Sequence, residues 1–143
     1  MTNARDFMHA GVECVPEHET LDRAAQLMRE HNVGSLPICG SDNRLKGIIT
    51  DRDIVVKCIA VGKDPSKMTA ASLAEGTPVW VTAEANEDDV LALMSEHLIR
   101  RLPVMDEGHQ LIGMISEADL ATHLSPDKVA RYCNTVYAAP ATI

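Results

Sequence analysis

The sequence repeats itself, and this internal duplication constrains the fold more than any other feature of the chain. Shifted by 66 positions, residues 11–58 align with residues 77–124 without a gap. The segments LMREH and LMSEH coincide in this alignment, and so do LKGIITDRDI and LIGMISEADL. An ungapped match of this length is hard to obtain by chance, so the chain contains two copies of one structural unit.

Each copy has the pattern of a strand, a helix, two further strands and a second helix. Thr20 and Asn86 are suited to begin the first helix of each copy, because their side chains favour the N-cap position. A helix between two strands favours a parallel pair, and the short polar turn that follows favours a β-hairpin. The predicted strands are 12–15, 36–39 and 46–50 in the first copy, with 79–82 opening the second, and an additional helix is predicted over 127–137.

Composition and charge narrow the classes of function. The 143 residues carry a formal net charge of −8, and the basic residues are scattered along the chain. Nucleic-acid binding needs clustered Lys and Arg to neutralise phosphates, so we expect no nucleic-acid partner. No apolar run approaches the roughly 18 residues of a membrane-spanning helix, so we expect no membrane association. No secretory leader is visible, which makes a cytoplasmic location the default expectation.

Short motifs recur in the same order in both copies. The first copy contains LPI at 36–38 and GIITDRD at 47–53, and the second contains LPV at 102–104 and GMISEAD at 113–119. Together with the linker segment GKDP at 62–65, this ordered set resembles a tandem pair of CBS motifs, called a Bateman module. The chain is also similar to small stand-alone CBS-pair proteins of the bacterial stress and hypoxia-response type.

The resemblance implies an α/β fold in which two βαββα repeats, related by a pseudo-two-fold axis, form one Bateman module. It implies a sensor or regulatory protein that takes adenosine-containing ligands such as AMP, ATP or S-adenosylmethionine in clefts between the motifs. It also implies a homodimer that pairs through helices. The expected domains are CBS motif 1 at 4–58, a linker at 59–71, CBS motif 2 at 72–124, and a C-terminal helix and tail at 125–143.

The family's T/S-x-x-D pattern falls on Thr50 and Asp53 in the first copy, and on Ser116 and Asp119 in the second. Residues three apart at a strand-to-helix junction share one face of the first helical turn. A hydroxyl beside free backbone N–H groups suits a phosphate, and a carboxylate can accept hydrogen bonds from two ribose hydroxyls. The same residues also suit helix capping alone. The sequence leaves both interpretations open.

Three side chains near helix ends are candidate zinc ligands. His97 lies near the end of the first helix of the second copy, and His123 lies near the end of its last helix. Cys58 is close to the equivalent of His123 in the first copy. Imidazole and thiolate suit Zn²⁺, which takes about four N, S or O ligands, and a second chain could complete the set. The alternative is that the histidines complement helix dipoles or lie in an interface.

The cysteines contain no CxxC pair, which excludes a zinc ribbon or a thioredoxin-like motif. Cys14 falls on the first predicted strand and Cys39 on the next. If these strands are parallel neighbours, the two thiols come within disulfide reach. Free buried thiols are the alternative expectation in a reducing compartment. A Cys14–Cys39 disulfide would instead make leaderless export credible.

Two functions follow, and neither is enzymatic, because no base emerges to activate a cysteine nucleophile. The first is a regulatory CBS-pair protein of a stress response, which binds an adenosine-type ligand. The second is a zinc-stabilised, disulfide-containing stress protein that binds no nucleotide. Such a protein would act through contact with an unidentified protein partner, including outside the cell.

Overall fold

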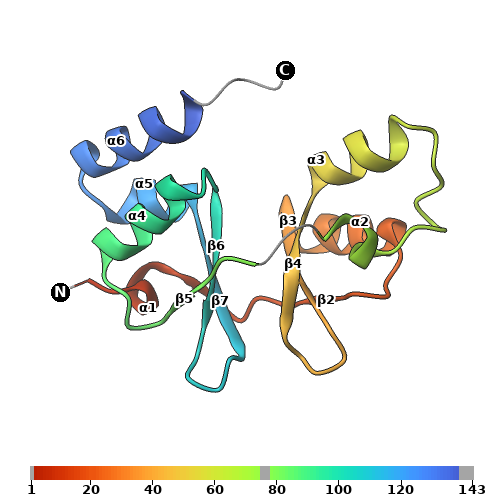
Figure 1. The fold of residues 1–143 in the computed structure, drawn as a ribbon, viewed down its shortest axis with the longest axis horizontal. Coiled ribbons are helices and arrows are strands. Elements are labelled where there is room, and N and C mark those ends of the chain that lie inside the picture. The colour runs from red at the N-terminus through yellow and green to blue at the C-terminus, as the bar shows by residue number, and fades with distance from the viewer. Residues whose placement is uncertain (1, 75–77, 139–143) are drawn as a thin grey trace. The chain divides into compact units, whose positions relative to one another are not determined.

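The computed structural model describes residues 2–74 and 78–138, and it divides the chain into two compact units (Figure 1). The first-repeat unit comprises Glu13–Pro78. The second-repeat unit combines the chain from Val79 onward with the N-terminal segment up to Val12. Each unit holds one copy of the duplicated sequence. The predicted tail, 139–143, and Thr77, where the second aligned copy begins, lie outside the described residues.

The first-repeat unit is built on a three-stranded sheet with the order β2-β3-β4. As predicted, β2 runs parallel to β3, and β3 forms an antiparallel hairpin with β4. Helix α3 continues directly into a π-helical turn, η1. The elements are β2 (Val15–Pro16), α2 (Leu21–His31), β3 (Ser35–Cys39), β4 (Leu45–Thr50), α3 (Asp51–Ile54), η1 (Val55–Ile59) and the 3₁₀ helix η2 (Ala70–Leu73).

The first strand of each repeat is shorter than the sequence predicts. The expected strand at 12–15 shrinks to β2, because Val15 is the one residue of that stretch whose side chain is buried, opposite Ile38. The strand expected at 79–82 shrinks in the same way to β5 (Val81–Thr82). A run of β-favouring residues therefore predicts too long a strand where some of those residues are exposed and do not pair with a neighbouring strand.

The second-repeat unit repeats this arrangement and adds one strand, giving the order β1-β7-β6-β5. The extra strand, β1 (His9–Ala10), lies antiparallel along β7 and follows a short helix, α1 (Ala4–Phe7). The sequence pattern predicts neither element, since the repeat alignment begins after them. The remaining elements are β5, α4 (Glu87–Glu96), β6 (Arg101–Met105), β7 (Leu111–Ser116), α5 (Glu117–His123) and α6 (Pro126–Tyr137).

Each unit has its own aliphatic core, which agrees with the scarcity of aromatic residues. Ile49 of β4 is fully buried in the first-repeat unit, and its equivalent Ile115 of β7 is fully buried in the second. Phe7, the only phenylalanine of the chain, is 1% exposed and belongs to the second core. The N-terminal segment therefore completes the core of the repeat that comes later in the chain.

Helix α6 packs against α4 and α5 of the second-repeat unit (Figure 1). Tyr132 is buried there, and its hydroxyl donates to the carbonyl oxygen of Ile99 at 2.7 Å. Lys128 pairs with Glu87 and Asp88 on α4. The additional helix predicted over 127–137 is thus present. Within the described residues it is the longest helix, and no helix there is long and apolar enough to cross a membrane.

Candidate ligand and metal sites

Thr50 and Asp53 lie at the junction between β4 and α3, as the T-x-x-D pattern predicts. The Asp53 backbone N–H donates to Thr50 Oγ1 at 3.1 Å, and the Thr50 N–H donates to Asp53 Oδ2 at 3.0 Å. This reciprocal pair is a capping box, in which each side chain satisfies a backbone donor that the helix leaves free. The other carboxylate oxygen, Oδ1, lies 3.3 Å from Lys57 Nζ. The Asp53 side chain remains 23% exposed.

Ser116 and Asp119 form the same capping box between β7 and α5. The Ser116 N–H and hydroxyl both donate to Asp119 Oδ2, at 2.8 and 3.0 Å. The remaining oxygen, Oδ1, lies 2.9 Å from His9 Nε2. Both oxygens of Asp119 are therefore in polar contact, and its side chain is only 6% exposed. Among the residues that the structure describes, Asp119 is the one charged residue that is buried.

His9 is a site residue that the sequence pattern does not reveal. It lies outside the duplicated segments, in a strand of two residues that carries no detectable period. The pairing of β1 with β7 places His9 opposite Met114, two residues before Ser116, and so brings its ring to Asp119. The His9 side chain itself is 72% exposed. The two predicted ligand motifs are thus alike in their caps and different in what faces the second carboxylate oxygen.

The predicted zinc ligands are distributed over both units. His97 is the C-cap residue of α4, and His123 is the last residue of α5; both are exposed. Cys58 belongs to the first-repeat unit, where it is fully buried and its thiol donates to the carbonyl oxygen of Lys63. Among the described residues, no group of three or more His, Cys, Asp and Glu side chains lies close enough to hold a metal ion. A single chain therefore assembles no complete zinc site in this part of the structure.

His123 is nevertheless oriented in a way that suits metal binding. Its Nδ1 lies 3.0 Å from the carbonyl oxygen of Asp119 in the preceding turn. When Nδ1 donates its proton there, the lone pair is on Nε2, which is the arrangement that metal-ligating histidines usually adopt. The Phe7 ring is near, with its centroid 6.3 Å from that of His123.

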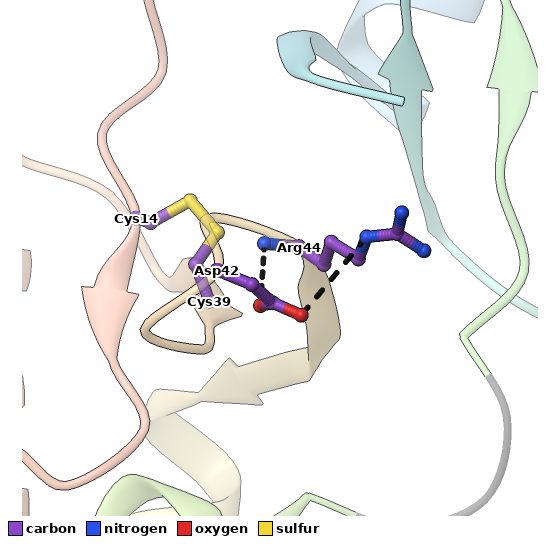
Figure 2. The surroundings of a disulfide bond; sticks show 4 residues. All are labelled: Cys14, Cys39, Asp42 and Arg44. Atoms are coloured by element: carbon purple, nitrogen blue, oxygen red, sulfur yellow. Dashed lines mark hydrogen bonds and ion pairs between the residues drawn. A yellow bond between two sulfur atoms is a disulfide. The ribbon is translucent and has the colours of Figure 1, made fainter. Parts of the chain in front are cut away.

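Cys14 and Cys39 are joined by a disulfide in the first-repeat unit (Figure 2). Their Cα atoms are 5.6 Å apart, because β2 and β3 are parallel neighbours. Cys14 directly precedes β2 and Cys39 ends β3. Of the two expectations for this pair, the disulfide is the one present. The equivalent residues of the second repeat, Trp80 and Met105, offer no such link.

The disulfide adjoins the polar turn between β3 and β4. Asp42 in this turn accepts a hydrogen bond from the Arg44 backbone N–H at 3.1 Å and faces the Arg44 side chain (Figure 2). Its Oδ2 also lies 3.9 Å from Lys46 Nζ. The Arg44 N–H is the main reason why the pKa of Asp42 lies below its usual value, and the neighbouring cations add to this effect. The Asp42 carboxylate thus caps a backbone N–H of the turn next to Cys39.

Comparison with known families identifies the duplicated unit. The family model of the CBS domain matches residues 4–59 and again residues 71–126. This chain belongs to the CBS-domain family. Its two repeats are a CBS pair, and the α/β fold with two CBS motifs that the sequence predicts is confirmed.

Several known CBS-pair proteins resemble the whole chain. Hypoxic response protein 1 of Mycobacterium tuberculosis is 51% identical over 136 residues, which cover 95% of this chain and 94% of that protein. A crystal structure of Hypoxic Response Protein I, described as having two coordinated zinc ions, is 55% identical with a TM-score of 0.78. It covers 87% of this chain and 100% of that one. The present protein is therefore a CBS-pair homologue of a hypoxic response protein.

Two more distant CBS pairs show what else the fold accommodates. The CBS pair of MJ0100, solved in complex with 5′-methylthioadenosine and S-adenosyl-L-methionine, is 25% identical with a TM-score of 0.75, over 85% of this chain and 98% of that one. A hexameric CBS-CP12 protein from bloom-forming cyanobacteria is 30% identical with a TM-score of 0.76, over 85% of this chain and 71% of that one. CBS pairs related to this chain thus include a ligand-bound protein and an oligomer.

Proposed function

We propose that this protein is a non-catalytic regulatory CBS pair of a stress response, and that it binds an adenosine-type ligand through Thr50 and Asp53. The observation that carries this proposal is the difference between the two motif carboxylates. Asp53 is partly exposed, and its Oδ1 lies 3.3 Å from Nζ of Lys57, a flexible side chain of the η1 turn. Asp119 is buried and already contacts His9. The MJ0100 complex supports an adenosine-containing ligand.

The chemistry of Asp53 fits recognition of a ribose. An ionised carboxylate only accepts hydrogen bonds, and two vicinal hydroxyls are a matching pair of donors. Asp53 can exchange its contact with Lys57 for these hydroxyls while Oδ2 stays on the Thr50 N–H, so the cap survives ligand binding. Asp119 would first have to give up His9. We therefore place the primary ligand position in the first repeat and a weaker one at Ser116 and Asp119.

The test is calorimetric titration of the full chain with AMP, ATP and S-adenosylmethionine. We expect at least one of them to bind the wild-type protein and binding to fall at least tenfold in Asp53→Ala. Asp51→Ala is the matched control, because it removes the same charge from the exposed neighbouring position and should bind normally. The 2′-deoxy form of the ligand should bind the wild type more weakly than the ribose form does. Asp53→Ala should bind the two forms with equal affinity.

Flat titrations of the wild type with all three ligands would refute the adenosine proposal. An equal loss of affinity in both variants would show that overall charge, rather than the Asp53 carboxylate, determines binding.

Zinc binding is a second candidate function, favoured by the exposed histidines at the ends of α4 and α5. The relative with two coordinated zinc ions supports it. His97 and His123 would supply two imidazole ligands from the second-repeat unit, and zinc needs about two more. Cys58 is the predicted third ligand, but its thiol would have to leave the carbonyl of Lys63 and become accessible. In this form the protein is a disulfide-containing stress protein that binds no nucleotide.

Metal analysis separates the two functions. Protein purified without chelator and dialysed extensively should retain stoichiometric zinc, and His97→Ala should lose it. His109→Ala is the control, because His109 lies in the β6–β7 turn and its ring faces Trp80. A metal-free wild type, or equal zinc in His97→Ala and the wild type, would reject the zinc function.

We further propose that the protein acts as a homodimer and through contact with another protein. Exposed apolar side chains on the first repeat support an additional binding surface. The Cys14–Cys39 disulfide supports export to an oxidising compartment, whereas a reducing cytoplasm would favour free thiols. Non-reducing mass spectrometry of protein isolated from cells and from culture medium tests this placement: only reduced, cell-associated protein would contradict the export.

A further inference from the structure

His9 lies at the surface, against the buried carboxylate of Asp119. Its Nε2 atom is 2.9 Å from Asp119 Oδ1, and its side chain is 72% exposed, whereas that of Asp119 is 6% exposed. In the first repeat the equivalent carboxylate, Asp53, is 23% exposed. In both motifs Oδ2 accepts the backbone N–H of the capping residue, so Oδ1 is the oxygen left for other partners. The oxygen that we assign to a ligand in the first repeat is therefore the one that His9 contacts in the second.

The strand that carries His9 has few attachments. β1 contains only two residues, and both are exposed. They pair with Met114 and Gly113 of β7. Segments with few buried contacts and solvent-exposed backbone hydrogen bonds open at a low cost in free energy. β1 can therefore separate from β7 while the core of the unit stays folded, and the contact with Asp119 is one of the few that hold it in place.

The residues on either side of β1 limit the part of the chain that can move. Phe7 is 1% exposed and belongs to the second core, and Met8 packs against that core, so both anchor the chain before the strand. Gly11 follows the strand with φ +71°, a left-handed conformation that glycine adopts without strain. It is exposed, and a Cβ there would meet no other atom within 4 Å. Residues 9–11, which we call the N-terminal strap, thus lie between a buried anchor and an unhindered glycine.

The position of the strap on β7 depends on Gly113. A Cβ at this residue would lie 2.5 Å from Met8 Sδ and 2.8 Å from the carbonyl oxygen of His9. Real Cβ atoms do not approach other atoms this closely, so a side chain at 113 would push the strap away from β7. The strap can therefore be loosened by mutation in two independent ways, at His9 and at Gly113.

A ligand that takes Asp119 has to replace His9. A ribose hydroxyl can donate to Oδ1 in place of the imidazole, while Oδ2 stays on the Ser116 N–H and the cap survives. Exchanging one donor for another costs far less than leaving a buried acceptor without a partner. Ligand binding and attachment of the strap are therefore linked: the contact that lowers the affinity for the ligand is the contact that the ligand removes from the strap.

We propose that the N-terminal strap is an autoinhibitory element of the second adenosine position, with His9 occupying Asp119 until a ligand displaces it. The protein then fills the position at Asp53 first and the position at Asp119 only at higher ligand concentration. This inference rests on the proposed adenosine function and adds the regulation of its second position.

Release of the strap changes the covalent connection between the two units. The chain passes from β1 through Gly11 and Val12 into Glu13, where the first-repeat unit begins. Once β1 leaves β7, these residues and the strand itself become part of a longer free connection, and each extended residue spans about 3.3–3.6 Å. Occupation of the second position thus lengthens one of the two connections between the repeats, which is a change that a regulatory partner can detect.

The experiment is calorimetric titration with AMP, ATP and S-adenosylmethionine of full chains that carry Asp53→Ala, so that only the second position is measured. Adding His9→Ala should raise the affinity at least tenfold, which corresponds to about 1.4 kcal/mol. Adding Asp119→Ala as well should abolish this gain. Arg5→Ala in the Asp53→Ala background is the matched control, because Arg5 belongs to the same N-terminal segment but pairs with Glu84. It should leave the affinity unchanged.

Hydrogen exchange, followed by mass spectrometry, measures the strap itself. Saturating ligand should speed exchange of the amides of residues 9–11 severalfold in the wild type. Gly113→Ala should do the same without ligand and should also raise the affinity of the second position. Gly108→Ala is the control for this change, because a Cβ at Gly108 would make only an ordinary contact, 3.4 Å from Asp106 Oδ1.

Equal affinity with and without His9→Ala, or an equal gain in Arg5→Ala, would overturn the strap proposal. If the wild type meanwhile binds ligand through Asp53, the proposed function stands without the strap. Binding that appears only after His9→Ala and depends on Asp119 would support the strap and reject the assignment of the primary position to Asp53. Flat titrations of every variant would reject both. If His9→Ala fails to fold by circular dichroism, the comparison of Gly113→Ala with Gly108→Ala decides.

Discussion

The two repeats have the same local chemistry and different surroundings. Both carry a hydroxyl and a carboxylate three residues apart, and both use them in a capping box. In the first repeat the carboxylate of Asp53 is partly open to solvent, whereas in the second the carboxylate of Asp119 is buried against His9. The difference does not come from the duplicated residues. It comes from an N-terminal segment that lies outside the duplication and belongs to the second-repeat unit.

The helical faces differ for the same reason. Helix α6, also outside the duplication, covers the second repeat and leaves the first repeat with a groove and exposed valines. The disulfide is a feature of the first repeat instead. It joins Cys14, next to β2, to Cys39 of β3, and the equivalent residues of the second repeat are not cysteines. The added N- and C-terminal segments therefore cover the second repeat. The first repeat is cross-linked by the disulfide and keeps a more exposed surface.

Removing the disulfide should have the largest effect, and it should act on the first repeat. A disulfide that closes a loop of 25 residues stabilises a protein by about 3 kcal/mol, mainly by restricting the unfolded chain. We expect Cys14→Ser/Cys39→Ser to lose this much stability in urea unfolding. Cys133→Ser, a change at a free and half-buried cysteine, is the control and should lose little. Identical urea midpoints for the wild type with and without reductant would show that the bond contributes nothing.

Alanine substitutions of the two motif carboxylates should affect stability unequally. Asp119→Ala removes the acceptor for the Ser116 N–H and for His9 in a buried site, which should cost about 2–3 kcal/mol. Asp53→Ala removes a more exposed cap and should cost about 1 kcal/mol. The fluorescence of Trp80, the single tryptophan, reports on the second-repeat unit, and circular dichroism reports on both. Equal losses would contradict the asymmetry of the two sites.

The hydroxyl of Tyr132 should have a smaller effect, confined to the second repeat. Tyr132→Phe keeps the ring in its buried place and removes the hydrogen bond to the Ile99 carbonyl, so we expect a loss of about 1 kcal/mol. Tyr137→Phe on the exposed end of α6 is the comparison and should lose less. Thermal unfolding followed by Trp80 fluorescence measures both. A Tyr132→Phe protein as stable as the wild type would mean that apolar packing alone holds α6.

Alkaline pH should weaken the attachment of α6 without any mutation. Burial raises the pKa of Tyr132 above its usual 10, and hydrogen bonding to Glu87 raises that of Lys128 above 10.5. A raised folded-state pKa gives stability that is complete below the unfolded-state pKa and is lost as the pH rises above it. The second-repeat unit should therefore lose stability above about pH 10, where unfolded tyrosine ionises. A spectrophotometric titration at 295 nm should show tyrosinate appearing above pH 10 in the folded protein and earlier in urea; coincident curves would contradict this.

Much of the fold follows from the sequence because the duplication can be checked against itself. The hairpins, the parallel pairings and the caps at Thr50 and Ser116 are all visible as motifs that occur twice. The N-terminal strand is not, because two residues are too short to show a period and have no second copy. The contact between His9 and Asp119 could therefore not be predicted either. The boundaries of β2 and β5 depend on which neighbours are buried, a property of the tertiary structure that local apolar pattern does not contain.

The N-terminal segment also orders events during synthesis. Phe7 and His9 are made before their partners in β7 and α5, which follow about a hundred residues later. The first-repeat unit, which is continuous in sequence, can complete its core as soon as Pro78 has emerged. The second-repeat unit must instead join two segments that are far apart in the sequence, and contacts between distant parts of a chain form slowly. A chain shortened to begin at Glu13 would make the first repeat intact and leave the second with an unpaired sheet edge and an incomplete core.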